Sequence, residues 1–255
     1  MSVDLKARLS AQGVVVGTFI QDMRDPFVVQ LVAAAGLDFV IIDTEHGAFN
    51  RETVADLIKL ARALDVIPIV RVIAPTYEYL CPPLDAGATA LLLPRIDGPE
   101  VLRSAVRATR YPPEGVRGLV MVKGQTDYVL PDLAEYAAAA NKTNVLIPQI
   151  ELRQALEKLD DILSVNGVDV ALVGPCDLSV ALGRPGQFDH PEQVRSIETV
   201  LEACRRHDVV PGIAVGSVAA ARTWMAKGMR FVCCGADVSI LRAGLAEIAQ
   251  LKPRR

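Results

Sequence analysis

Short apolar runs and amphipathic stretches alternate regularly along this chain. A run of apolar residues bounded by polar residues or glycine is typical of a strand that is buried on both faces. The predicted strands are Val14–Ile20, Phe39–Asp43, Pro68–Val72, Ala90–Pro94, Val145–Glu151, Val168–Gly174, Val210–Val215 and Phe231–Gly235. Helices are predicted between these strands and after the last one, over 26–35, 51–64, 76–86, 98–110, 152–163, 191–207, 217–227 and 238–250.

The alternation of strand and helix predicts the fold class. Eight strands, each followed by a helix, in a chain of 255 residues are typical of an α/β fold, the (β/α)8 TIM barrel. An open, doubly wound sheet is the alternative, but the length and the regular alternation favour the barrel. We expect one domain over residues 1–255, with an excursion over 112–143 between the fourth helix and the fifth strand. Loops of that length usually have a function, so we expect it at the active site or at a subunit contact.

Composition narrows the class of function. The chain is 51% hydrophobic and only 5% aromatic, which suits helices packed on a parallel sheet. Its 27 basic and 30 acidic residues are interspersed, without a basic stripe, so we do not expect nucleic-acid binding. No apolar run is long enough to span a membrane, and the charged start lacks the core of a signal peptide. We therefore expect a cytoplasmic protein with reduced cysteines.

Two carboxylates mark the first candidate site. Glu151 ends the fifth predicted strand, and Asp177 follows the sixth. A helix joins the two strands, so they run parallel and both acids emerge at the same end of the sheet. Neighbouring carboxylates repel each other unless a positive group lies between them, and a divalent cation with oxygen ligands would serve. The alternative is that each acid is a helix cap or an ion-pair partner, which is the commoner role of an acid at a strand end.

Further polar residues fall at the same ends of the predicted strands, where the active sites of such barrels lie. Asp43 ends the second strand, His46 follows it, and Gln149 lies near the end of the fifth. We interpret His46 as a general base, because histidine titrates near neutral pH; a structural histidine is the alternative. Arg71, in an otherwise apolar strand, either holds an oxyanion or forms a buried pair with an aspartate.

The segment after the sixth strand predicts an anion-binding turn. It reads Gly174-Pro175-Cys176-Asp177. Backbone amides at a glycine turn beside a helix N-terminus can hold a carboxylate. Cys176 has no histidine beside it in the sequence, so we interpret it as part of the pocket wall and not as a nucleophile. Asp85, at the end of the third predicted helix, is from its position alone a cap or loop acid.

Together these motifs resemble a known family of metal-dependent pyruvate aldolases. The matching stretches are Ile41–His46, Leu84–Ala88, Arg107–Gly118, Gln149–Glu151, Gly167–Asp169 and Gly174–Ser179. The chain resembles, over nearly its whole length, the HpcH/HpaI family of 4-hydroxy-2-oxoheptanedioate and 2-keto-3-deoxy-sugar-acid aldolases. The resemblance implies a class II carbon–carbon lyase. Such an enzyme splits a 4-hydroxy-2-oxo acid into pyruvate and an aldehyde, or joins them, through a metal-stabilised pyruvate enolate.

The resemblance also implies how metal binding and proton transfer are divided among the residues. Glu151 and Asp177 would be the protein's ligands to Mg²⁺, Mn²⁺ or Co²⁺. His46 would be the base, acting through a water on the metal. Asp85 would orient His46, from its own or a neighbouring subunit, which replaces the interpretation of Asp85 as a cap. Asp43 is a further catalytic candidate beside His46.

The same resemblance implies how pyruvate is held and how subunits assemble. Arg71 would stabilise the enolate oxygen, and Gln149 would line the pocket. The pyruvate carboxylate would lie against the turn formed by Gly174, Pro175, Cys176 and Asp177. Members of the family are typically hexamers, trimers of dimers, in which the last helix is exchanged between barrels. We therefore expect a homo-oligomer.

Two segments depart from the pattern of the family. They are Phe19–Pro26 and Leu119–Tyr128, and both are expected near the aldehyde, so the resemblance does not identify that substrate. One alternative function is an acyl-CoA lyase of the citryl or malyl type on a related barrel. It would need a basic cluster for the CoA phosphates, and the predicted strand ends offer only Arg71. The other is a non-catalytic ligand-binding barrel, which has no need of the acids, His46 and Arg71 together.

Overall fold

Eight parallel strands form the centre of the molecule in the computed structural model, which describes residues 3–252. The strands are β1 (Val15–Ile20), β2 (Phe39–Asp43), β3 (Ile67–Arg71), β4 (Ala90–Leu93), β5 (Val145–Ile150), β6 (Val170–Val173), β7 (Val210–Val215) and β8 (Phe231–Ala236). Each strand pairs with its neighbours along the chain, and β8 returns to β1 and closes the barrel. The predicted (β/α)8 barrel is thus confirmed, with strand ends within two residues of the predicted ones.

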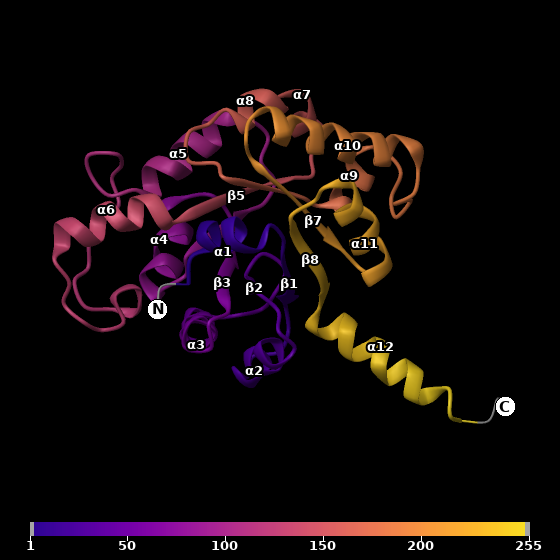
Figure 1. Ribbon diagram of the computed structural model, residues 1–255, viewed down its shortest axis with the longest axis horizontal. Helices are drawn as coiled ribbons and strands as arrows, with labels where there is room; N and C mark the ends of the chain where they lie inside the picture. The colour runs from indigo at the N-terminus through magenta and orange to yellow at the C-terminus, as the bar shows by residue number, and fades with distance from the viewer. Residues whose placement is uncertain (1–2, 253–255) are drawn as a thin grey trace.

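Helices surround the barrel (Figure 1). They are α1 (Leu5–Gln12), α2 (Phe27–Ala34), α3 (Arg51–Ala63), α4 (Tyr77–Ala86), α5 (Pro99–Thr109), α6 (Leu133–Thr143), α7 (Arg153–Glu157), α8 (Leu159–Leu163), α9 (Pro175–Ala181), α10 (Pro191–Arg206), α11 (Val218–Lys227) and α12 (Asp237–Ala249). The helix predicted over 152–163 is divided into α7 and α8, because the backbone leaves the helical conformation at Lys158. Helix α9, which is only 7 residues long, was not predicted. Within residues 3–252, no helix has the length and apolar character that crossing a membrane requires.

Strand residues alternate between the barrel interior and the layer of helices, as the two-residue period of a strand requires. In β2, Val40 and Ile42 pack in the apolar cluster that includes the surrounding helices, whereas Phe39 and Ile41 pack in the interior cluster. The ring of Phe39 stacks on that of Phe231 at a centroid distance of 4.4 Å. Every second residue of a strand thus faces the barrel interior, and we call these residues the interior series of the strand. At the carboxyl end of the strand, the next member of this series points into the mouth of the barrel.

The excursion predicted over 112–143 is anchored at both ends. Tyr111 donates its backbone N–H to Asn141 Oδ1 at 2.7 Å, and Asn141 Nδ2 donates to the carbonyl of Tyr111 at 3.0 Å. Further along the excursion, Arg117 forms an ion pair with Asp85 of α4, with Nη2 2.8 Å from Oδ1. The excursion also contains a short 3₁₀ helix, η1 (Gly124–Thr126), and α6. It is thus held against α4.

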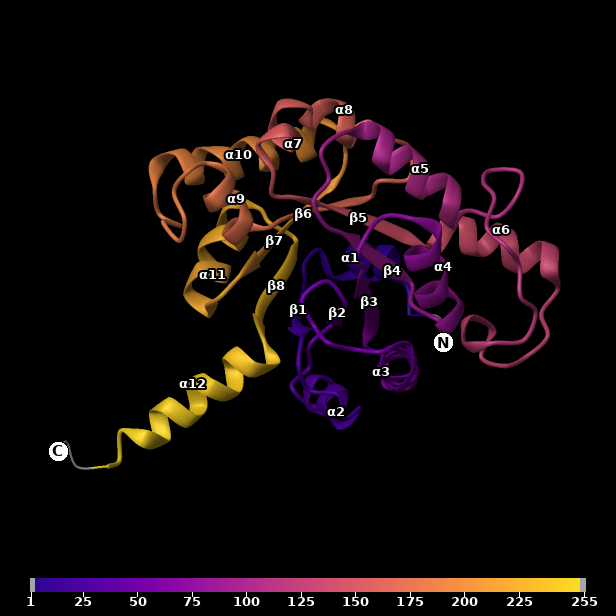
Figure 2. The same cartoon turned by 180° about the vertical axis from the view of Figure 1, so that it is seen from behind.

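Helix α12 leaves the barrel after β8 and projects away from it (Figure 2). Four of its large apolar residues are at least half exposed, namely Ile240, Leu241, Leu245 and Ile248. On α2, Phe27 and Leu31 are also exposed, at 46% and 56%. An apolar helix that covers no core of its own chain is typical of a segment that packs against another molecule. The predicted exchange of the last helix remains a prediction.

Candidate functional site

The interior series of three strands ends in polar residues at the carboxyl end of the barrel. Phe39 and Ile41 are followed by Asp43, Ile67 and Ile69 by Arg71, and Val145 and Ile147 by Gln149, and all three polar residues are buried. The register pairs Asp43 directly with Arg71 on the neighbouring strand. The period of the strands therefore brings these predicted site residues to one mouth, where the active sites of such barrels lie.

Arg71 lies at the centre of an ion network. Its Nε is 2.9 Å from Asp43 Oδ1 and its Nη2 is 2.5 Å from Asp43 Oδ2, a two-point contact. Its Nη1 is 3.1 Å from Glu45 Oε2. The guanidinium carbon lies 4.9 Å from the centre of the Phe19 ring. The expected acid partner of Arg71 is therefore present within the chain, and Glu45 joins it.

The charges of this network favour the ionised forms of Asp43 and Arg71. Burial acts to raise the pKa of Asp43, but the hydrogen bond and the charge of Arg71 outweigh burial and leave that pKa below its usual value. Burial likewise opposes the charge of Arg71, and Asp43 outweighs it and raises the pKa of Arg71. The pKa of Glu45 is raised, chiefly by burial. The guanidinium therefore stays charged in the barrel mouth.

Glu151 is the second buried acid of the mouth. It is 2% exposed, and its Oε1 accepts the backbone N–H of Arg95 at 2.7 Å. Arg95 adopts a left-handed backbone conformation, with φ of 54°, and this aims its amide at the acid. Glu151 Oε2 accepts a hydrogen bond from Gln149 Nε2 at 2.5 Å. A Cβ at Gly174 would lie 2.7 Å from both Gln149 Nε2 and Glu151 Oε2, so a larger residue there would displace this pair.

Asp177 is a fourth acid near the mouth. It lies in the first turn of α9, and its charge acts to raise the pKa values of Glu151 and Glu45. Burial is the largest cause that raises the pKa of Glu151, to about 7. Gln149 Oε1 is buried without a hydrogen-bond partner. Oxygen donors with surplus negative charge suit a hard divalent cation.

The donor set fits a cation that the protein coordinates only in part. Among residues 3–252, no three side chains of His, Cys, Asp or Glu are arranged as a metal site. Mg²⁺ commonly keeps several waters and takes only one or two carboxylates from the protein. Glu151 and Asp177 match that pattern, because they leave positions for substrate oxygens.

His46 and Asp85 do not meet within one chain. The side chain of His46 is 63% exposed, and its Nε2 is 3.9 Å from Glu45 Oε2. Its backbone N–H is held by Asp43 Oδ1 at 3.3 Å. Asp85 lies in the last turn of α4, which runs away from the carboxyl ends of the strands, and it pairs with Arg117. A contact between Asp85 and His46 therefore requires a second copy of the chain.

The turn after β6 has the form of an anion cradle. Gly174 precedes α9 and Pro175 is its first residue, so the amides of Cys176 and Asp177 lie in the first turn, where a helix offers no acceptor. Gln193 Nε2 donates to the carbonyl of Pro175 at 2.9 Å and fixes the turn. Cys176 is exposed as a residue, but its thiol is partly enclosed. This burial and the charge of Asp177 raise the pKa of the thiol. A protonated thiol fits the predicted pocket wall better than a nucleophile.

Three residues of this region were not predicted as site residues. Glu45 lies in the matched motif between Asp43 and His46, and this position was the signal that the sequence offered; the structure adds its contact with Arg71. Gln21 and Asp237 carried no such signal, because the first lies in a loop and the second at the start of a helix.

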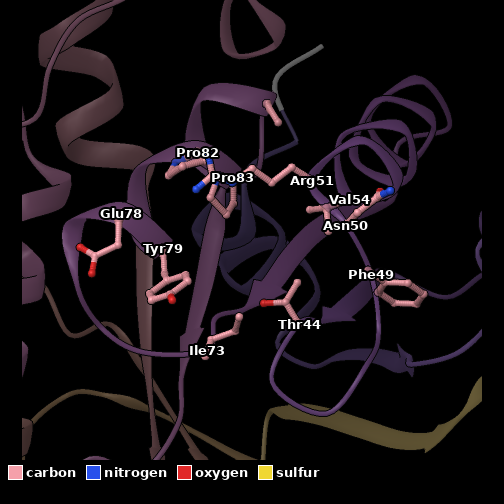
Figure 3. Close-up of a pocket in the computed structure, with 11 residues that line it drawn as sticks. Thr44, Phe49, Asn50, Arg51, Val54, Ile73, Glu78, Tyr79, Pro82 and Pro83 are labelled. Atoms are coloured by element: carbon pink, nitrogen blue, oxygen red, sulfur yellow. The ribbon is translucent and has the colours of Figure 1, made fainter.

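A cavity of about 130 Å³ lies beside the site, between α3 and α4 (Figure 3). Its lining is mostly apolar, with Phe49, Ile73, Tyr79 and Pro82 among the side chains. Thr44 borders it and follows Asp43 directly, but none of the predicted site residues lines it. The cavity is therefore a neighbour of the barrel mouth and not the mouth itself.

We expect Glu151→Gln to stabilise the metal-free protein at alkaline pH. The carboxyl has a pKa of about 7 in the folded protein and an ordinary value of 4.5. The folded state therefore binds more protons between these pH values, and its stability falls as pH rises from 4.5 to 7. Above pH 7, the wild type loses roughly 3 kcal/mol of its free energy of unfolding in this way, whereas Glu151→Gln, with a neutral amide, does not. Thermal unfolding in chelator at pH 5 and pH 8 measures this loss of stability. If Tm changes equally between the two pH values in the wild type and in Glu151→Gln, the expectation is contradicted.

Comparison with known proteins identifies the family of the chain. A family model described as HpcH/HpaI aldolase/citrate lyase matches residues 17–243. A 4-hydroxy-2-oxo-heptane-1,7-dioate aldolase from Klebsiella pneumoniae is 36% identical over 222 residues, which cover 86% of this chain and 83% of that protein.

Solved structures agree over the whole length of the chain. An HpcH/HpaI aldolase from Desulfitobacterium hafniense has a TM-score of 0.94 at 33% identity, covering 99% of this chain and 98% of that one. The citrate synthase SbnG has a TM-score of 0.87 at 32% identity, covering 97% of both chains. The chain belongs to the HpcH/HpaI aldolase/citrate lyase family, as its sequence motifs indicated.

Proposed function

We propose that the chain cleaves 4-hydroxy-2-oxo acids to pyruvate and an aldehyde, and forms them in the reverse direction, at the mouth of the barrel. Its relatives establish the enzyme class: it is a class II aldolase, a carbon–carbon lyase. The observation that carries the proposed site is the pairing of a charged, buried guanidinium at Arg71 with a cluster of carboxylates that lacks a full set of counter-charges.

Glu151 and Asp177 would hold a divalent cation, with Mg²⁺, Mn²⁺ and Co²⁺ as the candidates. When bound, such a cation acts as a Lewis acid that polarises the keto group of the substrate. Gln149 keeps the carboxylate of Glu151 oriented through its amide N–H and lines the pocket. The amides of Cys176 and Asp177 receive the carboxylate of pyruvate, at the turn that begins with Gly174 and Pro175.

Arg71 stabilises the enolate oxygen. A guanidinium has five N–H donors, and Asp43 and Glu45 occupy three of them, one on each nitrogen. The remaining two, on Nη1 and Nη2, are available to the oxygen on which charge develops. Asp43 thus acts by holding Arg71, and it also holds the backbone of the His46 loop.

His46 exchanges the proton of the pyruvate methyl group. Its exposed ring is open to substrate above the network, and its Nε2 lies 3.9 Å from Glu45 Oε2. Asp85 would orient the ring from a neighbouring subunit, because it lies in the last turn of α4 within its own chain. This assignment requires an oligomer.

The second substrate is less defined than pyruvate. One close structural relative is named as an aldolase and another as a citrate synthase, so the family alone leaves the electrophile open. A CoA thioester would need positive charge for its phosphates, and the polar residues at this mouth are mainly acids and Arg71. We therefore place aldehydes before acyl-CoA thioesters.

Pyruvate release from a panel of 4-hydroxy-2-oxo acids, with and without chelator, tests the proposed function. We expect release that chelator abolishes and added Mg²⁺, Mn²⁺ or Co²⁺ restores. A parallel panel of citryl-CoA and malyl-CoA tests the alternative. Cleavage of the thioesters without cleavage of any 4-hydroxy-2-oxo acid would overturn the proposal.

We further propose a homo-oligomer in which α12 packs on a neighbouring barrel, with the hexamer of the family as the expected form. The exposed apolar side chains of α12 and the exposed Phe27 and Leu31 of α2 would then be covered. The five free cysteines fit the reducing cytoplasm, in which we expect the protein to act.

We expect Leu245→Asp to weaken this assembly. Leu245 is 57% exposed on α12, so a charge there costs the single chain little but would be buried at the proposed contact. Light scattering at micromolar concentration should show an oligomer for the wild type and smaller species for the variant. The exposed Gln250→Asp, just beyond α12, is the control. A monodisperse wild-type monomer would refute the assembly.

A further inference from the structure

The loop between β1 and α2 is held by the first residue of α12. Asp237, 7% exposed, accepts backbone N–H bonds from Gln21 at 3.1 Å, Asp22 at 3.1 Å and Met23 at 2.8 Å. A carboxylate that accepts several backbone amides is held firmly in one orientation. The loop after β1 and the start of α12 are thus joined at the mouth of the barrel.

A β-bulge in β8 aims Asp237 at that loop. Gly17 of β1 pairs with Cys233, but Phe19 pairs with Ala236, so β8 contains one extra residue between the two pairs. Gly235 lies in this interval with φ of 74°, a conformation that favours glycine. Bulges next to active sites commonly redirect a side chain, and here the redirected side chain is the anchor of the loop.

Gln21 connects the anchored loop to the ion network. Its Nε2 donates to Asp43 Oδ2 at 2.8 Å, the same oxygen that receives Arg71 Nη2. The other oxygen, Oδ1, receives Arg71 Nε and the backbone N–H groups of Glu45 and His46. The loop also packs closely on the next one, because a Cβ at Gly47 would lie 2.7 Å from the carbonyl oxygen of Gln21.

We infer that Gln21 and Asp237 are positioning residues that set the orientation of Arg71 through Asp43. The inference rests on the proposed role of Arg71 in the aldolase reaction. The plane of the Asp43 carboxylate fixes the plane of the guanidinium, because the contact between them has two points. Gln21 fixes that plane at Oδ2, and Asp237 fixes Gln21. A small rotation of Arg71 would displace the two N–H groups left for the enolate oxygen, and small displacements at reacting groups are costly.

The test uses exchange of the pyruvate methyl protons with solvent deuterium, in metal-loaded protein. Gln21→Met removes the amide and keeps the length of the side chain. We expect kcat for exchange to fall about tenfold with KM for pyruvate nearly unchanged, as for an interaction that acts in the transition state. Asp237→Asn should lower kcat several-fold in the same way.

A double-mutant cycle separates orientation of Arg71 from a general loosening of the fold. Arg71→Lys lacks the planar fork that Asp43 orients, so Gln21→Met should cost that variant less than a further twofold. Asp38→Asn is the matched control, since Asp38 accepts the N–H of Val16 at 2.9 Å at the opposite end of β1. It should lower Tm as Asp237→Asn does and leave exchange unchanged.

The possible results distinguish failure of the inference about Gln21 from failure of the proposed function. Wild-type exchange in Gln21→Met, with Arg71→Lys impaired, would overturn the inference and leave the proposed function intact. An equal loss from Gln21→Met in both backgrounds would also overturn it, because Gln21 would then act on something other than Arg71. No exchange by the wild-type protein with any of the three metals would overturn the proposed function itself, and the inference with it.

Discussion

Glu151→Gln is expected to abolish metal binding in the micromolar range and nearly all aldolase activity. A neutral amide is a poor ligand for a hard cation, and Glu151 is one of only two carboxylates proposed to hold it. Glutamine can still accept the N–H of Arg95 that Glu151 Oε1 accepts at 2.7 Å, and its own amide N–H can donate to Gln149 once the Gln149 amide turns to present Oε1. Asp177→Asn should behave alike. Titration calorimetry with Mn²⁺ measures the affinity, and the exposed Glu135→Gln on α6 is the control.

The same acid makes metal affinity depend on pH near neutrality. Burial raises the pKa of Glu151 to about 7 in the metal-free protein, so a cation must displace a proton at lower pH. Affinity should fall about tenfold for each pH unit below 7 and level off above it. Calorimetry in two buffers of different ionisation enthalpy would detect the released proton. Activity of Glu151→Gln in chelator equal to that of the wild type with metal would refute the assignment.

The barrel was predictable because its strands are buried on both faces. Runs such as 67–71 and 145–150, which are apolar except for Arg71 and Gln149, are typical of a parallel sheet that is covered on both faces. The two-residue period then explains why Asp43, Arg71 and Gln149 meet, since each continues the interior series of its strand. The pairing of Asp43 with Arg71 follows from the register of β2 and β3.

The remaining features depend on contacts that no local pattern encodes. Asp237 reaches the loop of Gln21 only because β8 bulges at Gly235, and the sequence shows an ordinary strand there. The two interpretations of Arg71 could not be separated from sequence, and in the structure the buried aspartate pair leaves two donors free for an oxyanion. Helix α12 has the composition of a core helix, and its departure from the barrel could be anticipated only from the family.

His46→Ala and Arg71→Ala are expected to slow pyruvate methyl exchange by different routes. Removal of a general base typically costs ~10²–10⁴-fold, so His46→Ala should lose most but not all of the exchange rate. The His46 side chain is 63% exposed, so its removal should leave Tm unchanged. Arg71→Ala should slow exchange because the enolate oxygen loses its donors.

Arg71→Ala should also unfold more easily, which distinguishes it from His46→Ala. It leaves the fully buried Asp43 and the partly buried Glu45 without their counter-charge, and loss of one partner of a buried pair costs about 3–5 kcal/mol. Arg71→Lys restores the charge without the two-point fork, so it should recover most of the stability and only part of the exchange. Metal affinity should change little in either alanine variant, because neither residue is a proposed ligand. If His46→Ala keeps the wild-type exchange rate while its affinity for Mn²⁺ collapses, His46 binds the metal and is not the base.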